Sequence, residues 1–230
     1  MIRQIFNAKR RKILIDVNTQ NDLLLPNGSK CIKNHRRVLA KLRRIFAWAR
    51  KRNITIISTS QVFYPDNGAD YCLDGTPGQK KITYSLLPNR ITFPADGLTY
   101  LPLDVLRRHR QIILHKRCTD PFDEPRIERL LTEISAAEFL VVGAPAESAV
   151  KAVVLGLLHR RKKVTVVTDA IGSHEKDTAR LALRKMAAKG ARLIKTKKIA
   201  GSSNLKHIGI CNCYVCRPTH QKIPLGANLS

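Results

Sequence analysis

The chain of 230 residues is short of acidic side chains: 17 Asp and Glu stand against 42 Lys and Arg, which leaves a formal net charge of +25 at pH 7. No apolar run approaches the roughly 20 residues that a helix needs to cross a bilayer, which argues against a membrane-spanning helix. Aromatic residues make up 5% of the chain, so platforms on which bases of a single strand could stack are not evident. A surface this basic attracts polyanions, and the composition favours a nucleic-acid partner over a membrane.

The first residues, MIRQIFNAKRRK, place their charges after a short apolar stretch. A secretory signal has the opposite order, so we expect a cytoplasmic protein, with a short mitochondrial presequence as the alternative. We expect residues 1–11 to form a basic arm, residues 12–200 to form one domain and residues 201–230 to form a tail.

Short β-branched runs alternate with longer segments of helical periodicity. The strand candidates are Ile13–Asp16, Ile54–Thr59, Ile112–His115, Phe139–Gly143, Val164–Thr168 and Arg192–Lys195, and the helical segments are 34–52, 123–136, 147–160 and 174–189. Near-continuous apolar strands separated by helices predict an α/β domain in which both faces of a parallel sheet are covered. Residues 61–104 are rich in Pro and Gly and are predicted to form a long loop or lid.

Polar residues end two of these strands. Asp16 ends the first, Lys116 follows the third, and a tight turn after Gly143 follows the fourth. The carboxyl ends of parallel strands meet at one crevice, where ligands bind. An Asp beside a thiol can act as a general base and a Lys can stabilise the thiolate, although such residues at strand ends are common.

Five segments carry a more specific signal, and in chain order they read ILIDVNTQNDLL, CLDGTPGQKKI, IILHKRCTDPF, VVGAPAESAVKAVVLGLL and VTVVTDAIGS. Their order and spacing resemble those of the isochorismatase-like cysteine hydrolases, in particular the nicotinamidase-related branch, over roughly residues 10–200. The resemblance implies a three-layer α/β/α fold with a six-stranded parallel sheet. It also implies an Asp–Lys–Cys triad that hydrolyses amides or related bonds, with a metal site in the nicotinamidases.

The resemblance puts Asp16 in the place of the family's aspartate and Lys116 in the place of its lysine. The family's cysteine lies six residues after the glycine of the turn, and here that position is Ala149. Alanine has no nucleophilic atom, so the resemblance implies a degenerate, inactive member. We expect Asp16 and Lys116 to persist as a buried pair, because removal of one partner alone costs several kcal/mol.

The resemblance also identifies the positions of the nicotinamidase metal ligands, which are an Asp-x-His after the second strand and a His in the lid. These positions hold Gln61, Phe63 and Tyr71. Phenylalanine cannot bind a metal, and Gln and Tyr are poor replacements for Asp and His. We therefore expect no metal there.

Members of the family often have a cis peptide two residues after the glycine of the turn, where this chain has Pro145. A cis X–Pro bond costs only about 0.5–1 kcal/mol, against about 3 kcal/mol before other residues. We therefore expect the Ala144–Pro145 bond to be cis.

The segment from His35 to Asn53 separates an apolar stripe from a basic one. The apolar stripe consists of Val38, Leu42, Ile45, Phe46 and Ala49. The basic ridge consists of Arg36, Arg37, Arg43, Arg44, Arg50 and Lys51. At 1.5 Å per residue the ridge is about 20 Å long, and no Asp or Glu occurs between residues 30 and 53. We expect the ridge to contact phosphates, together with Lys9, Arg10, Arg11 and Lys12 of the arm.

Further basic clusters are spread along the chain, and no helix-turn-helix or comparable motif that reads a sequence is present. These features favour structured RNA, recognised through its backbone and shape, over a defined DNA sequence, although charge alone does not exclude DNA. A small basic protein with an arm and a tail suits a large particle such as the ribosome, with ribosomal RNA and neighbouring proteins as partners. Self-association is a further expectation from the family.

The tail holds a cluster of potential zinc ligands: Cys211, Cys213, Cys216 and His220, with His207 nearby. Three Cys and one His can supply a tetrahedral zinc site, although this spacing matches no standard finger or knuckle. The alternatives are a reduced tail that docks on a partner and ligands shared with another chain.

Two other functions compete with RNA binding. A hydrolase could use Cys118, two residues after Lys116, as its nucleophile. A small-molecule sensor could retain the pocket for an aromatic carboxamide-like ligand without chemistry. Turnover of amides that is lost in Cys118→Ala would identify the hydrolase, and stabilisation by a ligand without turnover would identify the sensor.

Overall fold

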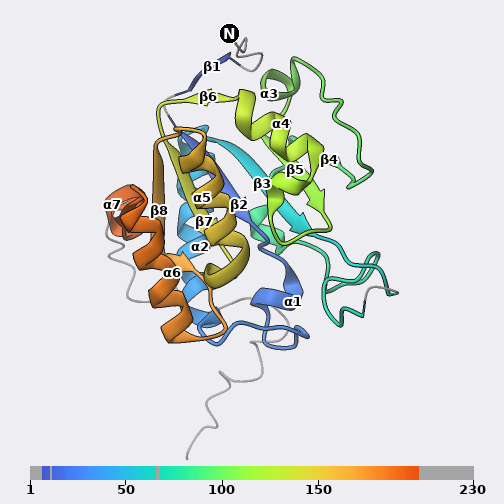
Figure 1. Ribbon diagram of the computed structural model, residues 1–230, viewed down its shortest axis with the longest axis vertical. Helices are drawn as coiled ribbons and strands as arrows, with labels where there is room; N and C mark the ends of the chain where they lie inside the picture. Colours follow the sequence, from blue (N-terminus) through green and yellow to red (C-terminus); the bar gives the residue numbers. More distant parts are fainter. Residues whose placement is uncertain (1–6, 11, 66–67, 202–230) are drawn as a thin grey trace, which may run out of the picture.

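The computed structural model of the protein describes residues 7–10, 12–65 and 68–201, with residues 7–10 described by their backbone alone (Figure 1). Arg11 and the cysteine cluster Cys211, Cys213, Cys216 and His220 lie outside the described residues. The zinc site and the contacts of the arm therefore stay predictions.

A single parallel sheet of seven strands forms the centre of the domain, in the order β4-β5-β3-β2-β7-β8-β9. The strands are β2 (Ile13–Val17), β3 (Thr55–Gln61), β4 (Arg90–Phe93), β5 (Gln111–Lys116), β7 (Phe139–Gly143), β8 (Val164–Ile171) and β9 (Arg192–Ile194). All six expected strands are present. The expectation of six was one short, because β4 lies at the sheet edge and its four residues are only alternately half-buried.

Helices cover both faces of this sheet, which confirms the three-layer α/β/α prediction. One face carries α1 (Asn21–Leu24), α2 (His35–Lys51) and α7 (Lys197–Ala200), and we call it the α2 face. The other carries α3 (Val105–Arg108), α4 (Pro125–Glu133), α5 (Lys151–His159) and α6 (Lys176–Ala188), and we call it the α5 face. In Figure 1, α5 and α6 lie in front of the sheet and α2 lies behind it.

Alternation along the strands assigns each side chain to one of these faces. In β2, Ile13, Ile15 and Val17 pack in the core of the α5 face, and Leu14 packs in the core of the α2 face. The same alternation places Asp16 on the α2 face.

The amphipathic pattern of the second helix is confirmed. The five residues of its apolar stripe are buried, namely Val38, Leu42, Ile45, Phe46 and Ala49. They pack in the core of the α2 face with Leu14, Ile56 and Leu140 from three neighbouring strands. Packing of this stripe against the sheet leaves the basic side of the helix outside.

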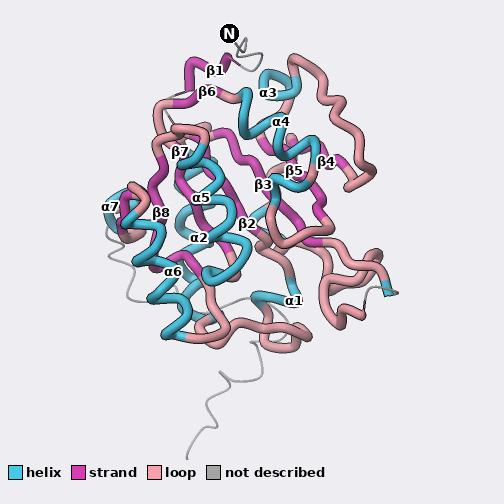
Figure 2. The backbone as a smooth tube through the Cα atoms, viewed as in Figure 1, coloured by secondary structure: helices cyan, strands magenta, loops and turns pink. Residues whose placement is uncertain are grey.

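The remaining elements are short. A two-stranded parallel sheet pairs β1 (Asn7–Arg10) with β6 (Ser135–Ala136). Single turns form η2 (Thr83–Ser85), η3 (Pro121–Asp123) and the π-helical η4 (Ala146–Val150). Figure 2 shows that the segment between β3 and α3 is mostly loop, as expected, apart from β4 and η2. No described helix has the length and apolar character of a membrane span.

Candidate functional site

Asp16 forms a buried ion pair, but not with the lysine that the sequence indicated. Its Oδ2 lies 3.0 Å from Nζ of Lys81 and accepts a hydrogen bond of 2.8 Å from Ser58 Oγ. Lys81 comes from the lid and also donates to the carbonyl of Thr59 at 3.0 Å. The expected pair of Asp16 with Lys116 is therefore wrong, because Asp16 points to the α2 face.

Lys116 ends β5 on the α5 face, two residues after Leu114 of that core. Its Nζ donates to Gln61 Oε1 and to the carbonyls of Cys118, at 2.6 Å, and Thr119, at 3.3 Å. Burial lowers the pKa of Lys116 to about 8. The ammonium thus holds the turn after β5, and its three N–H groups are bound to oxygen atoms of the protein.

Ala149 lies in η4, where it is 3% exposed and belongs to the apolar core of the α5 face. A methyl group there offers no atom that could attack a substrate. The turn before it has the expected cis peptide between Ala144 and Pro145.

Asn18 follows the last residue of β2, and sequence reasoning missed it. Its φ of 46° interrupts the alternation of the strand. Its Oδ1 accepts a hydrogen bond of 2.8 Å from Thr59 Oγ1, and Thr59 shares a side of β3 with Gln61, the partner of Lys116. A carboxamide cannot take up a proton as a carboxylate does, so this side of the sheet has no base at that position.

The positions that the resemblance assigns to the nicotinamidase metal ligands do not fit a metal. Nε2 of Gln61 donates to the carbonyl of Arg117 at 2.9 Å, and its Oε1 is bound by Lys116. The rings of Phe63 and Tyr71 pack edge to face, with their centroids 5.1 Å apart. Within the described ranges no group of three His, Cys, Asp or Glu side chains could hold a metal ion.

Neither cysteine near this site is arranged as a nucleophile. Cys118 is exposed, and Lys116 binds its carbonyl oxygen rather than its thiol. Cys72 is fully buried, and burial, followed by the nearby Asp22 carboxylate, raises the pKa of its thiol to about 12. An activated cysteine needs a lowered pKa and access to substrate, so the structure gives no support to the hydrolase alternative.

The basic ridge of α2 is free at its ends. Arg36, Arg37 and Lys51 are exposed, and none of them forms an ion pair with a carboxylate of the described chain. These three cations are available to an external anion.

The middle of the ridge is held by neighbouring groups. Arg43 stacks over the ring of Tyr84 at 5.2 Å, Arg50 donates to the carbonyl of Tyr84 at 2.8 Å, and Arg44 donates to the carbonyl of Gly201. Such contacts to rings and carbonyls orient a guanidinium without neutralising its charge. Lys12 differs, because it pairs with Glu138 at 3.2 Å and has its own carboxylate.

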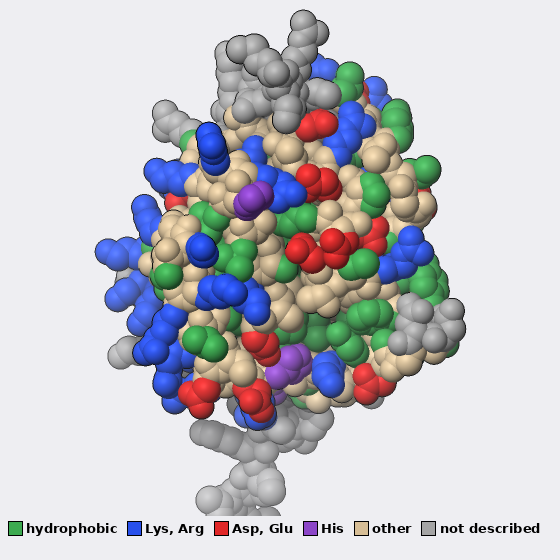
Figure 3. Space-filling view, in the orientation of Figure 1, with side chains coloured by type: hydrophobic (Ala, Val, Ile, Leu, Met, Phe, Trp, Pro, Cys, Tyr) green, Lys and Arg blue, Asp and Glu red, His purple; other side chains and the backbone are tan. Residues whose placement is uncertain are grey.

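The ridge continues around the β9 end of the sheet, because α7 packs against α2. We call the ridge and this continuation the basic edge. The continuation consists of the exposed cations Arg184, Lys185, Lys189, Arg192, Lys195, Lys197 and Lys198. Figure 3 shows Lys and Arg gathered along the left side of the molecule, over α6 and α7, whereas the acidic side chains of this view lie mainly elsewhere.

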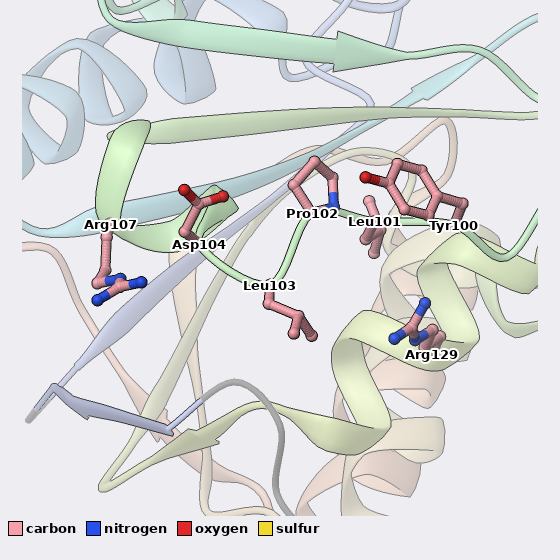
Figure 4. Close-up of a pocket in the computed structure, with 7 residues that line it drawn as sticks. All are labelled: Tyr100, Leu101, Pro102, Leu103, Asp104, Arg107 and Arg129. Carbon is pink, nitrogen blue, oxygen red and sulfur yellow. The ribbon is translucent and has the colours of Figure 1, made fainter.

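A surface hollow of 620 Å³ lies away from all these residues. Figure 4 shows Arg129 reaching it from α4, while the other labelled residues come from the segment that leads into α3 and, for Arg107, from α3 itself. Leu103 and Tyr100 in this hollow are 65% and 67% exposed, and Arg129 donates to the carbonyl of Thr99 at 3.1 Å. The hollow is not lined by Asp16, Lys116 or Ala149.

Comparison with known proteins agrees with this architecture. Residues 12–198 match the Isochorismatase domain family. No protein of curated function matches the chain at a significant level. Similar solved structures include the pyrazinamidase of Pyrococcus horikoshii in complex with zinc, with 17% identity, a TM-score of 0.62, and coverage of 80% of this chain and 99% of that one.

Two further structures share the fold. The nicotinamidase PncA of Bacillus subtilis has 16% identity and a TM-score of 0.64, with coverage of 80% of this chain and 99% of that one. The MAR1 ribonuclease of Caenorhabditis elegans has 21% identity and a TM-score of 0.55, with coverage of 85% and 83%.

Proposed function

The chain belongs to the isochorismatase family, and we propose that it is an RNA-binding member that does not hydrolyse amides through a cysteine. In this proposal it is a structural or regulatory component of a cytoplasmic ribonucleoprotein, and the ribosome is the first particle to test. The observation that carries the proposal is the basic edge, whose exposed cations form no ion pair with a carboxylate among the described residues.

The residues at the positions of the family's triad support the proposal that this chain does not hydrolyse amides through a cysteine. The nucleophile position is Ala149, the lysine is bound to carbonyl oxygens, and Asp16 lies on the opposite sheet face. Each of these features alone would impair a triad in which base, lysine and thiol must meet. Together these features argue against an Asp–Lys–Cys triad in this chain.

The distribution of charge supports the proposal that the chain binds RNA. Phosphate groups spaced along a folded RNA match a row of cations along α2 and around β9 better than a single small anion does. Recognition by backbone and shape needs no motif that reads base edges. The same fold occurs in a protein named as a ribonuclease, which makes RNA a reasonable ligand for this fold.

The experiment that tests the proposal is sedimentation of the native full-length protein from lysate of its own cells. Gradients would be run with and without ribonuclease and at two salt concentrations. We expect migration with a large particle, and loss of that migration after ribonuclease treatment. Retention at high salt would identify an integral component, because purely electrostatic binding falls steeply with salt. Migration as a small free oligomer in every condition would refute the proposal.

We also propose that the tail binds zinc through Cys211, Cys213, Cys216 and His220, since thiolates and imidazole are preferred zinc ligands. Metal analysis of the purified full-length protein tests this separately. We expect about one zinc per chain, lost in Cys213→Ser, and a metal-free wild-type protein would refute it.

A further inference from the structure

A cavity of 390 Å³ opens on the α2 face, at the carboxyl ends of β3, β4 and β5. Its floor is built by neighbouring strands: Ser60 of β3 is the register partner of His115 of β5, and Thr92 of β4 is the partner of Ile113. Register partners project to the same face of a sheet, so these side chains form one surface. Residues of the lid form the facing wall.

The lining of this cavity is cationic. Lys80, Lys81 and Arg90 contribute positive charges, and no Asp or Glu lines it. Lys81 is paired with Asp16, but Lys80 and Arg90 are exposed and have no carboxylate partner in the described part of the chain. One nitrogen of Arg90, Nη1, donates to the carbonyl of Leu87 at 2.8 Å, which fixes the guanidinium and leaves its other N–H groups free.

Polar groups in the cavity also lack partners. Ser60 is only 1% exposed, yet its Oγ has no hydrogen-bond partner among the described residues, and the same holds for the ring nitrogens of His115. The Ser60 hydroxyl is not among the fully enclosed polar atoms that lack a partner, so it can donate its proton to a ligand in the cavity. Burial lowers the pKa of His115, so its ring is a neutral donor at pH 7.

We propose that this cavity binds a phosphate ester of about the size of a mononucleotide. A phosphate offers several acceptor oxygens to the convergent donors of Ser60, Lys80 and Arg90, and Arg binds such groups through two parallel hydrogen bonds. The volume lies within the range of small-ligand sites, about 300–1,000 Å³, and exceeds what a bare ion needs. Leu86 and Ile113 add an apolar wall for the organic part of the ester.

The cavity is separate from Lys116 and Ala149, which lie on the α5 face, and it shares only Lys81 with the Asp16 ion pair. The proposal does not rest on RNA binding. The phosphate group that the cavity binds could belong to a free phosphate ester or to the end of an RNA strand. The two sources can be separated by experiment.

The test is isothermal titration of the full-length protein at low salt with adenosine 5′-monophosphate and with inorganic phosphate. We expect saturable binding of the nucleotide that is weakened at least about ten-fold in Arg90→Ala and in Lys80→Ala, and about three-fold in Ser60→Ala. Both cations are exposed, so these variants should fold. Lys163→Ala removes one exposed charge from the loop between α5 and β8 and is the matched control.

A second arm compares RNA 12-mers that carry a 5′-phosphate or a 5′-hydroxyl. If the phosphate strengthens binding and Arg90→Ala removes only that gain, the source is an RNA end. If the nucleotide binds and the end group has no effect, the source is a free ester. Absence of saturable binding in both arms, or equal weakening by Lys163→Ala, would overturn the proposal. The basic ridge variant Arg36→Ala/Arg37→Ala/Lys51→Ala should leave nucleotide binding intact, so failure of RNA binding can be distinguished from failure of this site.

Discussion

Charged side chains at the carboxyl ends of the strands have partners within the protein, whereas several along the basic edge have no carboxylate partner among the described residues. Inside, Asp16 and Lys81 neutralise each other, and the Lys116 ammonium is surrounded by oxygen atoms. Along the basic edge, Arg36 and Lys51 are exposed and have no carboxylate partner within the described residues. The inner charges hold segments of this domain together, whereas Arg36 and Lys51 form no ion pair within the described residues.

This difference indicates how a net charge of +25 is tolerated. Cations in the interior are neutralised or solvated by the protein itself, because an unpaired buried charge is expensive. Cations on the surface repel one another and lower stability when no partner is present. The exposed cations of the basic edge that have no ion-pair partner among the described residues therefore support the proposed polyanionic ligand.

The largest expected effect comes from breaking the inner pair. Lys81→Met leaves Asp16 buried with only Ser58 to bind it, since its Oδ1 already lacks a described partner. We expect a loss of about 3–5 kcal/mol in the free energy of unfolding, measured by urea denaturation. The double variant Asp16→Leu/Lys81→Met should recover most of this loss, because no charge is left unpaired. Equal losses in the single and double variants would contradict the pairing.

The pair itself was not predictable from the sequence, although most of the fold was. Six strands and the four main helices follow from apolar periodicity, since that pattern reflects burial directly. β4 was missed because its RITF segment is short and only half-buried at the sheet edge. Residues around it are rich in Pro and Gly, which concealed it further.

Which residues meet at the site depends on features that a sequence pattern does not show. Asp16 and Lys116 do lie at the same edge of the sheet, but the alternation of their strands sends them to opposite faces. Lys81 comes from a segment without periodicity. Asn18 has a positive φ that interrupts the alternation of β2. By contrast, the sequence alone shows alanine at position 149, which the resemblance assigns to the nucleophilic cysteine.

The next effect concerns the pH dependence of stability at Lys116. Burial lowers its pKa from 10.5 to about 8. Below pH 8 the lysine is protonated in both states, and the folded protein bears the full cost of the buried charge. Between pH 8 and 10.5 only the unfolded chain keeps the proton, so stability rises with pH.

The fall in pKa corresponds to a gain on the order of 3 kcal/mol over this window. Unfolding free energies at pH 7.5 and 10.5 should therefore rise more in the wild type than in Lys116→Met. Other basic groups titrate in both proteins and cancel in this comparison. An identical rise in the two proteins would show that the Lys116 ammonium carries no such cost.

The third effect appears in binding rather than in stability. The triple variant Arg36→Ala/Arg37→Ala/Lys51→Ala should weaken binding to structured RNA about 100-fold at 0.1 M salt and reduce the slope of log K against log salt by about 2–3. Its unfolding free energy should change by less than about 0.5 kcal/mol, because the three side chains are exposed. Filter binding at several salt concentrations gives both the affinity and the slope.

A matched variant removes the same charge elsewhere. Arg107, Arg117 and Lys163 are also exposed, and their replacement by Ala should weaken RNA binding less than about five-fold. If both triple variants lose affinity equally, the ligand responds to net charge alone. The basic edge would then have no special role.

The smallest expected effect is restoration of the thiol, which should not restore catalysis. In Ala149→Cys the new sulfur would have no free lysine beside it, because Lys116 is bound to carbonyl oxygens, and Asn18 in place of a carboxylate cannot act as its base. Release of ammonia from nicotinamide should stay at the level of the wild type. Because position 149 is 3% exposed whereas Cys118 is exposed, iodoacetamide should modify Cys118 first, as followed by mass spectrometry. Turnover in this variant would contradict this expectation and would show that a thiol at position 149 can act beside Asn18 and the hydrogen-bonded Lys116.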